Sequence, residues 1–475
     1  MTFQRDLGYQ SIELMYKSSI SYQFARYGLR LNYEMLPQDI VHQAKRCLLD
    51  ALGCAIGAYE APGRPMCENV AKMLGGPEEA TVIGSGLRTS APNASFVNGF
   101  MVRFLDFNDR GGGGHNNESI PAILAIGERE KTGGSDFLTS VVISYELGAR
   151  VRESFIGTIF GHGFDFDLRA GLSMPPVLGR LMGLNEDQIA NAIGICASTH
   201  IPLNILDGDK EEFTMSKNTR FAWVARGAII ACMLAKQGFT GPVRVVEGDC
   251  GWRASILKGD MDLERMVNFS GWRIMKTSFK YLAASGVNHA HIHATIDIVK
   301  EHDLKPEDIA AVKIKLSKHG AEHTTTFTKK YPRNAESADH SAFFLTAIAI
   351  KDRAITPDSV KPENFTDPVV LDLIEKTTVE ADPNFILRTN GSHVAWQGAA
   401  EIITKDGRKF QKQVDVPHGF GNDNLTDKEL EQKFNDMAIK HMPEKQIKQI
   451  FDTVWNAEKL DDMGKLMKLM VFPSR

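Results

Sequence analysis

The stretch RFLDFNDRGGGGHNNESIP, from Arg103 to Pro121, joins two segments with helical patterns and concentrates polar side chains between them. Residues 93–105 before it and 120–132 after it have the composition of helices, with Asn93 as a possible cap of the first. Pro121 falls in the first turn of the second helix, where its missing N–H removes no hydrogen bond. We therefore expect a polar loop held between two helices.

The loop itself carries acid–base chemistry. Asp109 and His115 stand at either side of the four glycines at 111–114, which adopt backbone angles closed to other residues and let a ligand approach the main chain. A carboxylate and an imidazole in such a loop are typical of a general acid–base pair. The alternative is a polar loop with a helix cap and a solvated histidine.

Helical periodicity extends outward from this loop over most of the first half of the chain. Asn185 is a good N-terminal cap for the segment 186–200, and the small residues that end the segment 38–58 favour close helix packing. The expected helices are residues 38–58, 135–154, 168–184, 186–200 and 219–237.

The pattern changes near Gly271. Residues 312–318 alternate apolar and polar side chains, which predicts a half-buried strand, and residues 401–416 form two such runs around Asp406-Gly407, a hairpin signal. From Leu425 the pattern is helical again. We predict a mainly α fold: a large all-helical domain of residues 1–270 and 418–475, with a smaller α+β domain of residues 271–417 inserted into it.

Composition narrows the class of protein. The 475 residues carry a formal net charge of −4, with 43% hydrophobic and 24% charged side chains. No basic excess points to nucleic acid or to an acidic membrane surface. No apolar run approaches the ~18–20 residues of a membrane span, and residues 1–27 lack the apolar core of a secretory signal. The six cysteines form no CxxC pair, which favours free thiols and argues against an iron–sulfur cluster. We expect a cytoplasmic protein.

Three further stretches carry candidate site residues. Lys217 precedes an apolar helix, where a lysine and a helix N-terminus can hold a carboxylate together, although most single lysines are surface cations. Lys280 is followed by alternating histidines at 289, 291 and 293, which suggest acid–base or carboxylate binding, or else a zinc site on a strand. His340 precedes another helix and is a binding residue or part of a cap.

Together these stretches resemble the MmgE/PrpD family. The matching pieces occur in one order along nearly the whole chain: LPQDIVHQAKRCLLDALGCAIGA, RFLDFND with a following histidine, a lysine before a helix ending in GFTGP, EGDCGW, HATIDI, ESADHS and ELEQKF. The family includes 2-methylcitrate dehydratases, cis-aconitate decarboxylases and an epimerase. The resemblance implies a helical domain with a smaller α+β lid, a homodimer, a site between the domains, and no required metal or cofactor.

The resemblance also implies site residues: Asp109, His115, Lys217 and His293 as catalytic residues, and Arg103 and His340 as substrate-binding residues. Lys280, from the stretch before the histidines, is the third expected substrate-binding residue. Two departures stand out. Relatives often have His-Pro-Ser where this chain has His115-Asn116-Asn117, and often have a histidine near Phe166, where the nearest here is His162.

The implied chemistry is proton removal next to a carboxylate, followed by loss of hydroxide or carbon dioxide. Cations must then hold the charge of the enolate, and Asp109 and His115 would share the roles of base and acid in an order left open. The leading hypothesis is a cofactor-independent lyase, a dehydratase of a 2-methylcitrate-like tricarboxylate. The alternatives are decarboxylation of cis-aconitate, epimerisation of a small dicarboxylate, or a non-catalytic carboxylate-binding protein, which the two departures motivate.

Overall fold

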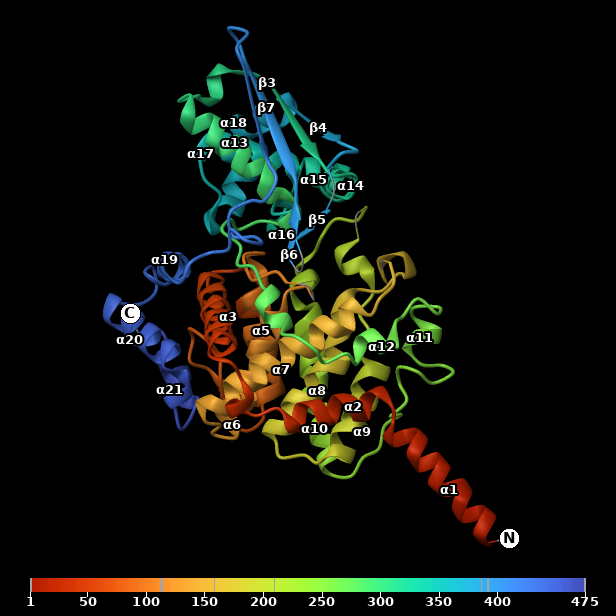
Figure 1. The fold of residues 1–475 in the computed structure, drawn as a ribbon. Helices are drawn as coiled ribbons and strands as arrows, with labels where there is room; N and C mark the ends of the chain where they lie inside the picture. Colours follow the sequence, from red (N-terminus) through yellow and green to blue (C-terminus); the bar gives the residue numbers. More distant parts are fainter. Residues whose placement is uncertain are drawn as a thin grey trace.

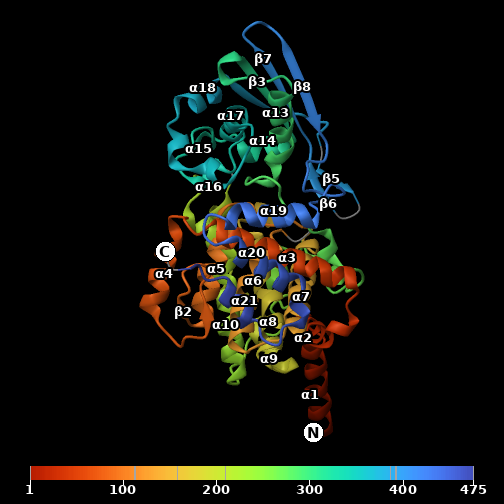
Figure 2. The same ribbon diagram turned by 90° about the vertical axis from the view of Figure 1, so that its left-hand side faces the viewer.

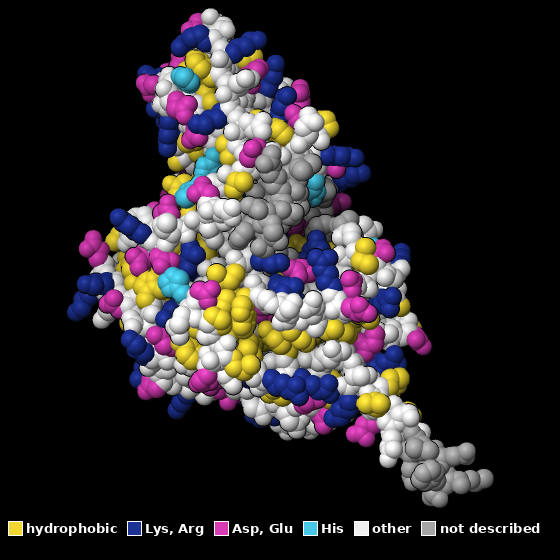
Figure 3. Space-filling view, viewed as in Figure 1, with side chains coloured by type: hydrophobic (Ala, Val, Ile, Leu, Met, Phe, Trp, Pro, Cys, Tyr) yellow, Lys and Arg dark blue, Asp and Glu magenta, His cyan; other side chains and the backbone are white. Residues whose placement is uncertain are grey.

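A computed structural model describes residues 2–111, 114–157, 159–208, 210–385, 387–390 and 393–473. The chain is mainly helical and has two visible parts: a large helical body and a smaller α/β part above it (Figures 1 and 2). The first helix, α1 (Thr2–Lys17), projects from the body (Figure 1). Charged side chains of both signs are intermixed on the face seen in Figure 3.

The helical body is built around helices that are buried on most of their surface. α7 (Gly134–Glu153) has side chains of its whole middle section buried, and it contacts both α3 and α8. The principal helices of the body are α2 (Ile20–Arg30), α3 (Gln38–Gly57), α5 (Ala91–Phe104), α6 (Ile120–Arg129), α7, α8 (Ala170–Leu181), α9 (Glu186–Thr199) and α10 (Arg220–Lys236). All the helices expected from the sequence in this region are confirmed, with ends shifted by a few residues.

The chain returns to the body at its C-terminal end. α19 (Asp427–Ala438), α20 (Glu444–Trp455) and α21 (Gly464–Leu469) contribute side chains to the same hydrophobic core as the first helices. α19 packs closely on α3 because small residues lie at the contact: a methyl group at Gly57 would meet Met437 Sδ at 2.8 Å. The expected close packing at the end of α3 is therefore confirmed.

The α/β part surrounds a four-stranded sheet with the order β4-β3-β7-β8. β3 (Ile309–Leu316) pairs in parallel with β4 (Thr377–Ala381) and antiparallel with β7 (Gly398–Thr404), which pairs antiparallel with β8 (Lys409–Val414). The β7–β8 hairpin turns at Asp406-Gly407 as expected, with Gly407 at φ 87°.

Helices cover this sheet and enclose a second core. α13 (His289–Glu301) packs on β7 and β8, and α17 (Ala342–Asp352) packs on α13 and on α18 (Pro368–Lys376). A short hairpin of β5 (Leu387–Asn390) and β6 (His393–Trp396) stands apart from the sheet. The second core draws on residues 282–402, whereas the first draws on residues 20–283 and 425–470. This supports an inserted domain; the bounds 271–417 and the motion of a lid stay predictions.

One alternative and one local expectation are not met. The histidines at 289, 291 and 293 lie on helix α13, so the strand that the alternative zinc site would need is not formed there. Asn93 lies inside α5 rather than at its cap, and its side-chain amide donates to the carbonyl of Gly75. In the described part of the chain, no helix is both long and apolar enough to cross a bilayer.

Candidate active site

A cavity of about 100 Å³ lies where the two parts of the molecule meet. The polar loop after α5, the segment before α13 and residues of the α/β part all reach it. The lining side chains include Arg103, Asp106, Arg110, His115, Phe166, Asp207, Arg220, Lys280, His319, His323, His340 and Trp396. Four of the seven expected site residues, Arg103, His115, Lys280 and His340, therefore line one cavity.

Asp106 is at the centre of this group. Its Oδ1 atom lies 2.7 Å from Arg103 Nη1 and 2.7 Å from Lys280 Nζ. Lys280 also donates to the carbonyl of Asp106, whose φ of 43° turns the chain sharply here. Burial disfavours the charged carboxylate, but Arg103 and Lys280 outweigh it and hold the pKa of Asp106 well below its usual range. Asp106 is therefore an ionised carboxylate that orients the side chains of Arg103 and Lys280.

His115 presents one ring nitrogen to the cavity. Its Nδ1 atom lies 2.5 Å from the carbonyl oxygen of Asp109. Because a carbonyl only accepts, Nδ1 carries the proton and Nε2 holds a free lone pair. Burial, reinforced by Arg103, lowers the pKa of His115 well below its usual range, so the ring is neutral. Nε2 lies 3.9 Å from Asp106 Oδ1 and is placed to act as a base.

The four glycines shape this loop as expected where they are described. Gly111 and Gly114 exchange two backbone hydrogen bonds, and Gly114 has a φ of 101°. A methyl group at Gly114 would meet the ring of Phe166 at 2.5 Å. Gly112 and Gly113 lie outside the described residues. Glycine at 114 thus allows both the turn and the close approach of Phe166.

The ammonium group of Lys217 is buried beside the cluster. It lies in the 3₁₀ turn Met215–Thr219 before α10, and its Nζ atom has no hydrogen-bond partner among the described residues. The nearest acidic atoms are Asp106 Oδ2 at 4.0 Å and Asp339 Oδ2 at 3.9 Å. A buried ammonium group that lacks hydrogen bonds has three donors available for an anion. Lys217 is therefore a fifth expected residue that joins the cluster, although it does not line the cavity wall.

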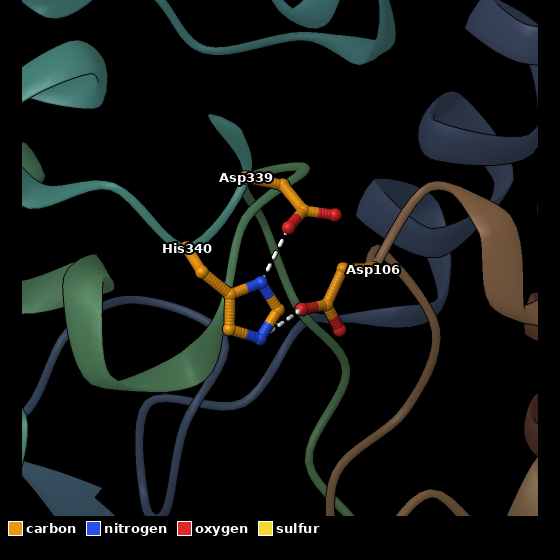
Figure 4. A group of neighbouring side chains, drawn as sticks. All are labelled: Asp106, Asp339 and His340. Atoms are coloured by element: carbon orange, nitrogen blue, oxygen red, sulfur yellow. Dashed lines mark hydrogen bonds and ion pairs between the residues drawn. The ribbon is translucent and has the colours of Figure 1, made fainter. Parts of the chain in front are cut away.

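His340 lies between two carboxyl groups (Figure 4). Its Nδ1 atom makes a short contact with Asp339 Oδ1, and its Nε2 atom lies 3.4 Å from Asp106 Oδ2. Burial raises the pKa of Asp339 well above its usual range and lowers the pKa of His340. Both groups therefore favour their neutral forms, with Asp339 donating to Nδ1 and Nε2–H directed at Asp106.

The same three side chains could satisfy the spacing of a metal site. Donor atoms of Asp106, Asp339 and His340 lie within 4.8 Å of one another. However, Arg103 and Lys280 already neutralise Asp106 at 2.7 Å. A divalent cation would be placed beside these positive charges, which repel it. The donor set therefore fits proton transfer better than metal binding.

Asp109 does not line the cavity. Its carboxylate accepts hydrogen bonds from Tyr145 Oη at 2.7 Å and from the N–H of Asn117 at 3.3 Å. Burial, with the neighbouring Asp50, raises the pKa of Asp109 to about 7. Its contact with the site runs through its backbone carbonyl, which holds His115. Asp109 is placed as a positioning residue.

This raised pKa predicts an effect on stability. Because the folded-state pKa of about 7 exceeds the ordinary 3.8, the contribution of Asp109 is fully present below pH ~4 and is lost as the pH rises through 7. Asp109→Asn should remove this loss, which is on the order of 4 kcal/mol for three pKa units. Urea unfolding at pH 5 and pH 8 should show a smaller pH dependence in the variant than in the wild type. Asp249→Asn, at an exposed aspartate, is the control; an equal change in both variants would contradict the prediction.

His293 lies apart from this group. It borders a separate hollow of about 690 Å³, where its ring stacks on Tyr281 with centroids 5.9 Å apart. Burial lowers the pKa of His293 to about 4. The structure thus does not bring His293 to the cavity, and its expected catalytic role stays a prediction that its placement does not favour.

The two departures from the family pattern have structural roles. Asn116 accepts a hydrogen bond from Arg169 at 2.7 Å, and Asn117 donates to Asp50 at 2.8 Å. Both side chains are buried behind the loop. Phe166 lines the cavity, whereas His162 lies 3.8 Å from Asp260 and does not. The asparagines therefore support the loop that carries His115.

Sequence reasoning missed Asp106 and Asp339. The spacing could have indicated Asp106: it follows Arg103 by three residues at the end of a helix, and this spacing places opposite charges side by side. Asp339 precedes His340 directly but carries no pattern of its own. Arg110, His319, His323 and Trp396 were also missed. Their approach to the cavity depends on how the α/β part sits on the body.

Comparison with known proteins assigns the chain to a family. The chain matches the models of the MmgE/PrpD N-terminal domain over residues 22–264 and of the MmgE/PrpD C-terminal domain over residues 283–457. It belongs to the MmgE/PrpD family.

Curated relatives match over nearly their full length. A cis-aconitate decarboxylase-like protein of Aspergillus oryzae is 22% identical over 96% of this chain and 98% of its own. Human cis-aconitate decarboxylase is 23% identical over 96% of this chain and 94% of its own. The 2-methylcitrate dehydratase of Salmonella typhimurium is 23% identical over 91% of this chain and 93% of its own. The chain is an enzyme of this family, and its relatives are lyases.

Proposed function

We propose that the protein is a cofactor-independent lyase that removes a proton next to a carboxylate of a small di- or tricarboxylate, with dehydration of a 2-methylcitrate-like acid as the leading reaction. The observation that carries this proposal is the neutral His115, whose free Nε2 faces the same cavity as Arg103 and Lys280. A base beside cations is the arrangement that enolate formation requires.

The cations would bind and stabilise the reacting carboxylate. Lys217 Nζ is buried and donates no hydrogen bond to any of the described residues. Lys280 is held by Asp106, and burial lowers the pKa of Lys280 to about 8. As a proton leaves the adjacent carbon, negative charge grows on the carboxylate, and a fixed ammonium group stabilises that state more than the ground state. Lys217 is the principal oxyanion partner in this proposal.

The proton transfers balance in the following way. His115 Nε2 takes the proton from carbon, and the C–O bond to the leaving hydroxyl breaks with its electron pair on oxygen. His340 Nε2–H protonates that oxygen, so that water leaves, and Asp339 replaces the proton at Nδ1. None of the six cysteines lines the cavity within the described residues. This supports a side-chain acid in place of an iron–sulfur cluster.

Decarboxylation of a cis-aconitate-like acid is the second candidate. It is favoured by relatives named as cis-aconitate decarboxylases that match 96–98% of this chain. In that reaction the C–C bond to a carboxylate breaks, carbon dioxide leaves, and a proton is delivered to carbon. Epimerisation would need only the proton removal and return.

An assay on metal-stripped protein tests the proposal. 2-Methylcitrate, citrate and cis-aconitate are offered separately, while ultraviolet absorbance of unsaturated acids and carbon dioxide release are recorded. Rising absorbance with the hydroxy acids supports dehydration, and gas release from cis-aconitate supports decarboxylation. Failure to turn over all three, or activity that returns only with added metal, would overturn a cofactor-free lyase for these acids.

The homodimer and cytoplasmic location expected from the sequence also stay proposals. An exposed apolar surface suits a second copy: Met66, Val70 and Leu74 of α4 (Gly63–Leu74) line the same hollow as Trp223 of α10, and all four side chains are exposed. A monomer in sedimentation equilibrium would contradict the dimer.

A further inference from the structure

Four strongly cationic side chains line the cavity, and three of them are neutralised by the protein. Arg103 pairs with Asp106 at 2.7 Å, as does Lys280. Arg220 lies 2.7 Å from Asp165 Oδ2 and 2.8 Å from Asp207 Oδ2. Arg110 is the exception, because no hydrogen bond or ion pair of its guanidinium group is found among the described residues.

The backbone of Arg110 is nevertheless firmly held. Its N–H donates to the carbonyl of Ser278 at 2.8 Å, and the N–H of Ser278 donates back at 2.7 Å. The guanidinium carbon lies 4.9 Å from the ring centre of Trp396, which belongs to β6 of the α/β part. The side chain is therefore fixed at its base and covered on one face, and its guanidinium N–H groups have no hydrogen-bond acceptor among the described residues.

Such an arrangement favours a bound anion. Desolvation, together with the nearby cations Arg152 and Arg103, lowers the pKa of Arg110 to about 10, although Asp106 opposes them. Arg110 is half-buried, and a cation withdrawn from much of its water is normally paired. Guanidinium groups bind carboxylates through two parallel hydrogen bonds. A ligand carboxylate would supply the missing partner.

We propose that Arg110, clamped under Trp396, binds a second carboxylate of the substrate, one other than the carboxylate next to the carbon that loses its proton. This inference rests on the proposed function and deepens it. Arg110 thereby selects acids with at least two carboxylates. Because the contact is present before and during the reaction, its loss should raise KM more than it lowers kcat.

Binding of three unreactive acids by isothermal titration calorimetry tests this without turnover. Tricarballylate has three carboxylates and no hydroxyl to lose; glutarate lacks its central carboxylate, and methylsuccinate lacks a terminal one. Arg110→Gln should weaken tricarballylate about tenfold to a hundredfold. One of the two dicarboxylates lacks the carboxylate that Arg110 contacts. For that acid, Arg110→Gln should weaken binding by less than about threefold, because the wild type has no such contact to lose.

Matched variants separate charge, shape and folding. Arg253→Gln makes the same charge change at an exposed arginine and should bind all three acids normally. Arg110→Lys keeps the charge but loses the fork, and should recover part of the affinity. Trp396→Leu should weaken tricarballylate severalfold, less than Arg110→Gln. Thermal unfolding confirms that each variant is folded.

Two outcomes overturn the assignment: Arg110→Gln binds tricarballylate like the wild type, or it weakens all three acids by the same factor. If the wild-type protein binds none of the three acids, the proposed function itself fails. If the wild type binds tricarballylate and Arg110→Gln binds it with the same affinity, only the role of Arg110 is disproved and the proposed function stands.

Discussion

Replacing His115 with asparagine is expected to lower kcat by about 10²- to 10⁴-fold, the usual range for a general base. The asparagine amide can take the place of Nδ1–H and donate to the carbonyl of Asp109, so the loop keeps the hydrogen bond that holds it. What disappears is the Nε2 lone pair that faces the cavity. The measurement is kcat with whichever acid the wild type turns over, together with exchange of the substrate's carbon-bound hydrogen in D₂O.

The complementary variant is His115→Gln, which places an amide near the Nε2 position but loses the contact with Asp109. It should be inactive and also less stable, whereas His115→Asn should be inactive at nearly unchanged stability. Hydrogen exchange at the wild-type rate in His115→Asn would show that another group removes the proton.

Lys217→Ala is expected to lower kcat/KM by about 10²- to 10³-fold, comparable to removal of an oxyanion-stabilising donor. Lys217 Nζ lies about equally far from Asp106 and Asp339 and has no hydrogen-bond partner among the described residues, so its donors can bind an anion. Its loss removes the positive charge that stabilises the developing enolate. Exposed Lys258 provides the control, since Lys258→Ala should retain full activity.

Chemical rescue makes this prediction sharper. The cavity left by Lys217→Ala should admit an alkylammonium ion, and added propylammonium should restore part of the rate. Lys217→Met fills the same space without charge and should not respond. Lys217 would not be the oxyanion partner if propylammonium raised the rate of both variants equally. The same conclusion would follow if both variants kept their activity without propylammonium and did not respond to it.

Much of the helical body follows from patterns that are local in the chain. Apolar spacing predicted α3, α7, α9 and α10, because a helix buries one face wherever it packs. Asn185 caps α9 with a reciprocal hydrogen bond to Gln188, as its position suggested. For the histidines of α13 the sequence left a strand open as an alternative, because a short alternation has the same appearance on a strand and on a buried helix.

The candidate site was less accessible to such reasoning. Arg103, His115, Lys217 and His340 were expected from the resemblance, and Lys280 from its own stretch of sequence; these five side chains do converge. The choice between Asp106 and Asp109 could not be made from spacing, since both lie in one loop. It depends on the backbone: Asp106 adopts a φ of 43° among the cations, while Asp109 turns toward Tyr145.

By itself, the sequence determined the principal helices around the polar loop, the hairpin at Asp406-Gly407 and the resemblance to the family, because capping, turn geometry and apolar period act between neighbouring residues. Only the tertiary structure decided which groups meet at the cavity and in what state of charge. His340 meets Asp106 from more than two hundred residues away. The neutral His115, the ionised Asp106 and the lowered pKa of Arg110 each result from burial and from charges that folding brings together.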